Sequence, residues 1–207
     1  MDLKEQLNLI KRIKAISETG LVYAKDGYDR ERYEELQQIS LKLMSSISNT
    51  SLEALQDFFI PQEDYPTPKV DVRAFVLNEN DEILMARESI DGKWTIPGGW
   101  ADIGSTPSEI AIKEVAEETG LKVEVVKLIA VYDKQMHPHP PEPYYIYKLM
   151  FLCKVVGGEL KAGFDMLDVG FFTLNNLPEL SKERILESQL KHLYQLAKST
   201  TPEVYFD

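Results

Sequence analysis

Apolar residues in the first sixty positions recur at steps of three and four. Leu7, Ile10 and Ile13 form one series, and a break at residues 24–27 separates it from a second. The second series comprises Leu36, Ile39, Leu43 and Ile47. Steps of three and four place side chains on one face of an α-helix. The pattern therefore predicts two amphipathic helices.

A third helix is predicted after residue 50, because Thr50-Ser51-Leu52-Glu53 has the Thr-x-x-Glu spacing of a capping box. Three prolines follow between Pro61 and Pro68. Each proline lacks a backbone donor and favours extended geometry in the residue before it. The sequence therefore predicts a small helical domain over residues 1–66 and a second domain over residues 67–207.

In the second domain the spacing changes to two or to short apolar runs, which is typical of strands. Residues 70–77 and 83–86 flank the turn at residues 78–81 and predict a hairpin. Further strands are expected at 93–96, 123–132, 144–156 and 170–174, and helices at 107–119 and near the end of the chain, where Leu186, Leu190, Leu193 and Ala197 repeat. Strands interrupted by helices predict an α/β domain with a mixed sheet and helices on its faces.

The helix at 107–119 is clearly delimited. Thr106 can cap it, Pro107 occupies the first turn, Glu109 completes a capping box, and Gly120 stops it. The residues expected to pack on the sheet are Ala111, Ile112, Val115 and Ala116.

Glu114, Glu117 and Glu118 share a different face of this helix. The ordinary interpretation of an acidic helical face is that water solvates it. The helix dipole, however, disfavours anions in the last turn by about 0.3–1 kcal/mol each, and Glu114 repels Glu118 one turn away. A hard divalent cation, Mg²⁺ or Mn²⁺, would make the cluster favourable. The turn at residues 97–99, Pro-Gly-Gly, adds bare backbone whose oxygens can face the cation.

Composition narrows the function classes. The 207 residues include 23 Lys and Arg against 34 Asp and Glu, a net charge of −11 that argues against binding to nucleic acid or to an anionic membrane. Cys153 is the single cysteine, so no intrachain disulfide can form, and a reducing compartment fits. Charged residues interrupt the N-terminal region where a signal peptide would be apolar, and no apolar run reaches about 18 residues. We expect a cytoplasmic protein.

Residues 99–121 resemble the Nudix box of the Nudix hydrolases. The positions that match its fixed spacing are Gly99, Glu114, Val115, Glu117, Glu118, Gly120 and Leu121. Two positions depart from it: Ser105 stands where the box has its first glutamate, and Lys113 replaces an arginine. Lys113 can pair with Glu117 one turn away, although a lysine lacks the bidentate fork of arginine.

The resemblance extends beyond the box to the helical region before it, the proline-rich residues 135–141 and the strand at 147–153. Together these resemble the subgroup that hydrolyses nucleoside diphosphates linked to another moiety, such as CDP-choline or ADP-ribose. The resemblance implies an α/β/α sandwich and metal-dependent cleavage of the diphosphate bridge into a nucleoside monophosphate and a phosphorylated partner. The alternative is a non-catalytic Nudix-fold module that binds or senses a nucleotide, which Ser105 and Lys113 would favour.

By the same resemblance, Glu114 and Glu118 are the principal ligands of Mg²⁺ or Mn²⁺, and the catalytic Glu117 and the Gly99 carbonyl assist. The general base would come from the acidic loop at 163–168, where the resemblance favours Asp165 and leaves Asp168 in reserve.

Arg73 and Arg87, near the site in the family layout, could bind substrate phosphate or form structural ion pairs. We assign His139 to substrate contact, since prolines stiffen its loop, and His192 to the surface or to packing. Nudix relatives are commonly dimers, so we expect residues 1–60 to help to form a homodimer and to shape the pocket for a small-molecule substrate.

Overall fold

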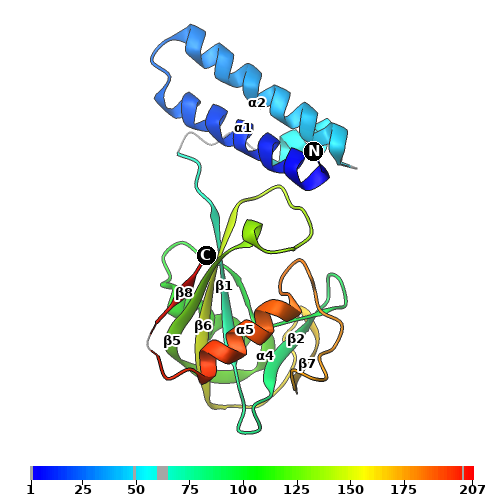
Figure 1. Cartoon of the computed structure of the whole chain (residues 1–207), viewed down its shortest axis with the longest axis vertical. Helices are drawn as coiled ribbons and strands as arrows, with labels where there is room; N and C mark the ends of the chain where they lie inside the picture. Colours follow the sequence, from blue (N-terminus) through cyan, green and yellow to red (C-terminus); the bar gives the residue numbers. More distant parts are fainter. Residues whose placement is uncertain (1, 49, 60–64, 202) are drawn as a thin grey trace. The chain divides into compact units, whose positions relative to one another are not determined.

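The structure, a computed structural model, describes residues 2–48, 50–59, 65–201 and 203–207 (Figure 1). It divides into two compact units, which are described separately. One comprises Met1–Pro68 with Pro141–Tyr144, and the other Lys69–Pro140 with Tyr145–Asp207. Part of the predicted boundary, residues 60–64, lies outside the described residues.

The first unit contains the helices α1 (Leu3–Tyr23), α2 (Gly27–Ile47) and α3 (Leu52–Phe58). The three predicted helices are thus confirmed. Each begins at a polar residue whose side chain accepts a backbone N–H of the first turn, which satisfies a donor that the helix leaves unpaired. These caps are Asp2, Asp26 and Ser51. The capping box expected at Thr50 is wrong by one position, since Ser51 Oγ accepts the N–H of Ala54 at 3.2 Å.

The core of this unit is small and comprises Ile10, Leu41, Met44 and Leu55. The segment Pro141–Tyr144 belongs to it: the Lys11 ammonium donates to the Tyr144 carbonyl, and the Tyr144 ring lies 5.1 Å from that of Phe58. The apolar series Leu36, Ile39 and Leu43 on α2 stays outside the core, with 38–41% of each residue exposed.

The second unit contains two sheets. The five-stranded sheet has the order β4 (Gly98–Trp100), β1 (Lys69–Val76), β6 (Ile146–Gly158), β5 (Leu121–Asp133) and β8 (Tyr205–Phe206). It is mixed, since β1 runs parallel to β6 and β5 to β8, whereas the other pairs are antiparallel. The antiparallel three-stranded sheet has the order β3 (Trp94–Thr95), β2 (Ile83–Glu88) and β7 (Met166–Phe172).

The hairpin expected between residues 70 and 86 is present only next to its turn and is wrong for the rest of the two strands. Leu77 and Ile83 form a single antiparallel bridge, after which β1 and β2 enter different sheets. Local turn residues bring the two strands together, but the pairing of each strand depends on neighbours far along the chain.

Helices α4 (Pro107–Thr119) and α5 (Glu187–Lys198) pack into two separate hydrophobic cores. The short 3₁₀ helix η1 (Lys134–Met136) follows β5. Alternate residues of a strand point to opposite faces. In β1, Val72 and Ala74 enter the core that contains Val115 of α4, whereas Phe75 enters the core that contains Leu190 of α5. Sheets with a helix packed into the core on each side confirm the α/β/α architecture.

The capping box of α4 is confirmed: Thr106 Oγ accepts the Glu109 N–H, and the Glu109 carboxylate accepts the Thr106 N–H at 2.8 Å. Gly120 ends the helix in the left-handed region at φ 71°. The predicted core face is wrong for two residues, because Ile112 and Ala116 are exposed. The buried residues are instead Ile110, Ala111, Val115, Glu118 and Thr119. The helix is therefore turned so that part of its acidic face meets the sheet.

None of the helices within the described ranges is long and apolar enough to cross a membrane.

Candidate active site

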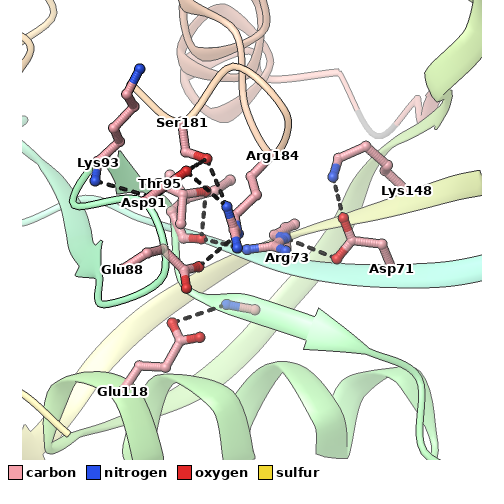
Figure 2. Close-up of polar contacts among 12 residues, drawn as sticks. Asp71, Arg73, Glu88, Asp91, Lys93, Thr95, Glu118, Lys148, Ser181 and Arg184 are labelled. Atoms are coloured by element: carbon pink, nitrogen blue, oxygen red, sulfur yellow. Dashed lines mark hydrogen bonds and ion pairs between the residues drawn. The ribbon is translucent and has the colours of Figure 1, made fainter. Parts of the chain in front are cut away.

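Glu118 lies in the last turn of α4 with 5% of the residue exposed. Its carboxylate accepts the backbone N–H of Gly98 at 3.2 Å, and Figure 2 shows it pointing up from the helix. Gly98 has φ 142°, and a Cβ there would lie 2.1 Å from the Val72 carbonyl oxygen, so only glycine brings this N–H to the carboxylate. The pKa of Glu118 is raised to about 8, mainly because burial disfavours the charged form; the Arg73 charge opposes this rise, and the charges of Glu114 and Glu88 add to it.

Glu114 lies one turn earlier on the same side of α4. Its carboxylate packs on the next glycine, where a Cβ at Gly99 would lie 3.0 Å from Glu114 Oε1. Desolvation raises the pKa of Glu114 as well. Glu117 differs from both because it is exposed. The structure therefore brings Glu114, Glu118 and the Gly98–Gly99 backbone together and leaves Glu117 toward the solvent.

These residues fit a hard divalent cation, although no three Asp, Glu, His or Cys side chains among the described residues form a ready metal cluster. Within the described residues Glu118 has no ion-pair partner, whereas the buried Asp71 has two. Burial without an ion-pair partner disfavours the charged form of the Glu118 carboxyl, as its raised pKa shows. A cation held by the oxygens of Glu114 and Glu118 would offset this effect.

Arg73 is buried in β1 and forms ion pairs within the protein. Its Nε donates to Asp71 Oδ1 at 2.8 Å and its Nη1 to the Ile96 carbonyl at 3.2 Å, and the buried Lys148 also pairs with Asp71. Burial would raise the pKa of Asp71, but Arg73 and Lys148 hold it below its usual value. Of the two roles that the sequence suggested for Arg73, phosphate binding or a structural ion pair, these contacts match the ion pair. Its positive charge also interacts with the carboxylate of Glu118.

The other candidates lie around the end of β2. Arg87 is exposed, donates from Nε to the Gly92 carbonyl at 2.7 Å, and lies opposite Asp168 in the β2–β7 pairing. Asp165 is exposed, and its carbonyl accepts the Ser89 N–H at 3.2 Å. Asp168 Oδ1 accepts the N–H of the following residue. Of the two aspartates, Asp165 is the one whose charge reaches the buried Glu88.

His139 is 6% exposed and lies in the loop after η1. Its Nδ1 must donate, because the partner at 2.7 Å is the Lys182 carbonyl. The Nε2 atom is buried and has no hydrogen-bond partner among the described residues. Burial lowers the pKa of His139 to about 4, so the ring is neutral at pH 7. His192 packs as expected, with Nδ1 2.9 Å from the hydroxyl of the buried Tyr132.

The expected pairing of Lys113 with Glu117 is wrong. Lys113 Nζ lies 2.9 Å from Asp102 Oδ2, because the loop before α4 brings an aspartate closer than the next helical turn does. Both side chains are about half exposed, so the pair contributes little stability.

Sequence reasoning missed Glu88 and Arg184. Glu88 is 9% exposed at the end of β2, and Arg184 Nε lies 3.0 Å from its Oε1 (Figure 2). Neither residue belongs to a recognisable spacing pattern, and the segments that bring them together are far apart in the chain. The charged pair Arg87-Glu88 directly after the apolar residues 83–86 was the one available signal.

Known protein families match both units of the chain. A NUDIX domain matches residues 67–194, and an N-terminal domain described as UDP-X-like and oligomerisation-related matches residues 4–59. The Bacillus subtilis protein YjhB, provisionally named an ADP-ribose pyrophosphatase, is 40% identical over 201 residues, which cover 97% of this chain and 96% of YjhB. An ADP-ribose pyrophosphatase of Methanocaldococcus jannaschii is 34% identical over 131 residues, 61% of this chain and 76% of its own.

Two solved structures are also similar. A UDP-X diphosphatase is 32% identical with a TM-score of 0.64, and the match covers 100% of both chains. An ADP-ribose pyrophosphatase from Streptococcus suis is 35% identical with a TM-score of 0.62, covering 68% of this chain and 100% of that one.

Proposed function

The chain belongs to the Nudix hydrolase family, as an enzyme similar to ADP-ribose pyrophosphatases, and on that premise we propose that it cleaves the diphosphate bridge of an ADP-ribose-like or CDP-choline-like conjugate with Mg²⁺ or Mn²⁺. The products would be a nucleoside monophosphate and a phosphorylated moiety. The observation that carries the proposal is the pair of partly or fully buried carboxylates, Glu114 and Glu118, on the glycine backbone. The names of the relatives support a substrate in which two phosphates link a nucleoside to another group.

The cation, when bound, neutralises charge on the diphosphate and helps to orient it for in-line attack by water. Glu114 and Glu118 would hold it, with the Gly99 carbonyl and Glu117 beside them. The Gly98 N–H keeps the Glu118 carboxylate in place. Asp165 would accept the proton of the attacking water at its carboxylate, which its exposed position permits.

Arg87 and His139 would contact the substrate, whereas the buried Arg73, which is paired with Asp71, would act through its charge on Glu118. Arg87 is exposed and therefore accessible to a phosphate. In His139 the bond from Nδ1 to the Lys182 carbonyl leaves Nε2 as an acceptor, so this atom can accept an N–H or O–H of the ligand but cannot bind its phosphates.

We further propose that the protein is a cytoplasmic homodimer joined through its helical unit. The support is the match to an oligomerisation domain and the exposed apolar series on α2. A single buried cysteine, Cys153, is compatible with a reducing compartment. The net charge of −11 gives no reason to expect nucleic acid or an anionic membrane as a partner.

A panel of ADP-ribose, CDP-choline, a UDP-sugar and nucleoside triphosphates, each with Mg²⁺ or Mn²⁺, tests the proposal. Chromatography should show a nucleoside monophosphate from the linked diphosphates and no turnover in the presence of EDTA. Hydrolysis of the triphosphates alone would contradict the substrate class. Tight binding without turnover of any compound would favour the non-catalytic nucleotide-binding alternative.

A further inference from the structure

Glu88 turns into the protein at an irregularity of the β2–β7 pairing. Arg87 lies opposite Asp168, but Glu88 lies opposite Met166, so Leu167 is an extra residue on β7. A bulge of this kind changes where side chains point. Here Arg87 is exposed, and the next residue, Glu88, is buried.

Arg184, in the loop before α5, provides the counter-charge. Its Nε lies 3.0 Å from Glu88 Oε1, and its Nη1 lies 3.1 Å from Asp91 Oδ2 and 2.8 Å from Ser181 Oγ. The Ser181 hydroxyl donates to Asp91 in turn, at 2.7 Å. The guanidinium is therefore held by three groups, and its rigid fork keeps Nε directed at Glu88.

Glu88 in turn faces the hydrolytic site. Its charge acts on Glu118 and on Arg73, and Figure 2 shows its carboxylate above that of Glu118. The next residue, Ser89, holds the loop of Asp165 through its N–H. A change in the position of Glu88 would therefore reach both a proposed metal ligand and the proposed base.

The pair is shielded enough for the ion contact to matter. The side chains of Arg184 and Glu88 are 20% and 12% exposed, and removing one partner of a shielded pair leaves an uncompensated charge. Without Arg184, Glu88 would lie unpaired beside Glu118 and would move away from it. We propose that Arg184 is a positioning residue of the hydrolytic site that acts through Glu88; the inference rests on the proposed function.

A double-mutant cycle with Arg184→Met, Glu88→Gln and both together tests this proposal in the full-length protein. Steady-state kinetics measures kcat and KM on ADP-ribose with Mn²⁺, and electron paramagnetic resonance measures the Mn²⁺ affinity of the substrate-free protein. Each single substitution should lower kcat about tenfold and weaken Mn²⁺ binding several-fold, with KM nearly unchanged. The double variant should be no worse than either single one.

Two further variants separate positioning from general stability. Arg184→Lys keeps the charge beside Glu88 but cannot also bridge to Asp91 and Ser181, so it should recover part of kcat. Lys191→Met, which removes an exposed ion pair with Glu187 on α5, is the matched control and should change neither the kinetics nor the Mn²⁺ affinity.

Effects that multiply in the double variant, or a folded Arg184→Met protein with kcat within twofold of wild type, would overturn the proposal. If Arg184→Met does not fold, Asp91→Asn releases one anchor of the guanidinium. The Asp91→Asn substitution should lower kcat in the wild-type background and have no effect in Glu88→Gln; equal effects in both backgrounds would also overturn the proposal.

A wild-type protein that binds Mn²⁺ but cleaves no linked diphosphate would refute the proposed function alone, since Mn²⁺ affinity would still report whether Arg184 and Glu88 are coupled.

Discussion

Glu118 is buried, and its carboxylate accepts, within the described residues, a hydrogen bond only from the backbone N–H of Gly98. Desolvation and repulsion from Glu114 both disfavour its charge, so local stability does not explain the residue. The proposed cation would explain it, because a divalent ion favours the same charge that folding disfavours. At this site the proposed function and stability would therefore oppose each other.

Glu118→Gln should lower kcat at least about 100-fold, since the amide keeps the shape but loses a charged metal ligand. The melting temperature of the cation-free protein should stay the same or rise, because glutamine avoids the cost of burying an ionisable carboxyl whose folded-state pKa is raised to about 8. Steady-state kinetics and calorimetry measure the two effects. Glu117→Gln, at an exposed position, is the comparison and should cost less activity. Near wild-type turnover of Glu118→Gln at limiting metal would refute the assignment.

His139 should make stability depend on pH. Its pKa is about 4 in the folded protein against an ordinary 6.5, so between these values the unfolded chain binds a proton that the folded protein does not. The free energy of unfolding should fall as the pH drops from about 6.5 to about 4, by at most about 1.4 kcal/mol per pH unit, with no further contribution below that range.

Urea unfolding of the wild type and of His139→Asn across this range measures the effect. Asparagine retains a donor for the Lys182 carbonyl but does not titrate. The difference in stability between the two proteins should therefore change with pH. Parallel curves would show that His139 is not the group responsible.

At the scale of the elements, α4 determines where the carboxylates lie. Its start is held by the reciprocal bonds of Thr106 and Glu109, and its end by the left-handed Gly120. The end is also packed: a Cβ at Gly163 would lie 2.1 Å from the Glu117 carbonyl, and the Gly163 N–H donates to the Glu118 carbonyl at 2.9 Å. The last turn of α4 is thus held in place both by its own terminal glycine, Gly120, and by contacts with the backbone at Gly163.

Thr106→Ala should lower the free energy of unfolding by about 1 kcal/mol, because the N–H of Glu109 loses its acceptor. Chemical denaturation measures this cost. Glu109→Gln is the matched control: glutamine can still accept the Thr106 N–H, so stability should change by a few tenths of a kcal/mol. Equal losses in the two variants would argue against the capping role of Thr106.

At the scale of the whole molecule, the helical unit has more apolar surface than its core uses. Gln37, Ser40, Leu41 and Met44 are the buried residues of α2. The series Leu36, Ile39 and Leu43 lies on a different side of the helix and is about 40% exposed. An exposed apolar stripe on a surface helix is typical of an interface.

Ile39→Glu combined with Leu43→Glu should shift the protein from dimer toward monomer, because each charge would be desolvated in the interface. Size-exclusion chromatography with light scattering measures the shift. Val126→Glu, at a residue of β5 that is 55% exposed, is the control and should leave the mass unchanged. A wild-type protein that is monomeric at all concentrations would contradict the homodimer.

The sequence by itself determined the helices, most of the longer strands, and which helix carries the proposed metal ligands. Capping by Thr106, the stop at Gly120 and the spacing of Glu114, Glu117 and Glu118 are local properties, since they depend on residues within one or two helical turns. The fixed spacing of the Nudix box is local in the same sense, which is why the family could be predicted from the chain alone.

Only the tertiary structure decided which groups are buried and which charges meet. The rotation of α4 follows from packing Ile110 and Val115 on the sheet, and it buries Glu118 while exposing Ile112 against expectation. Arg184 and Asp91 lie 93 positions apart, and no local pattern relates them. Burial and ion pairing depend on contacts between distant segments, and these form only when the sheets assemble.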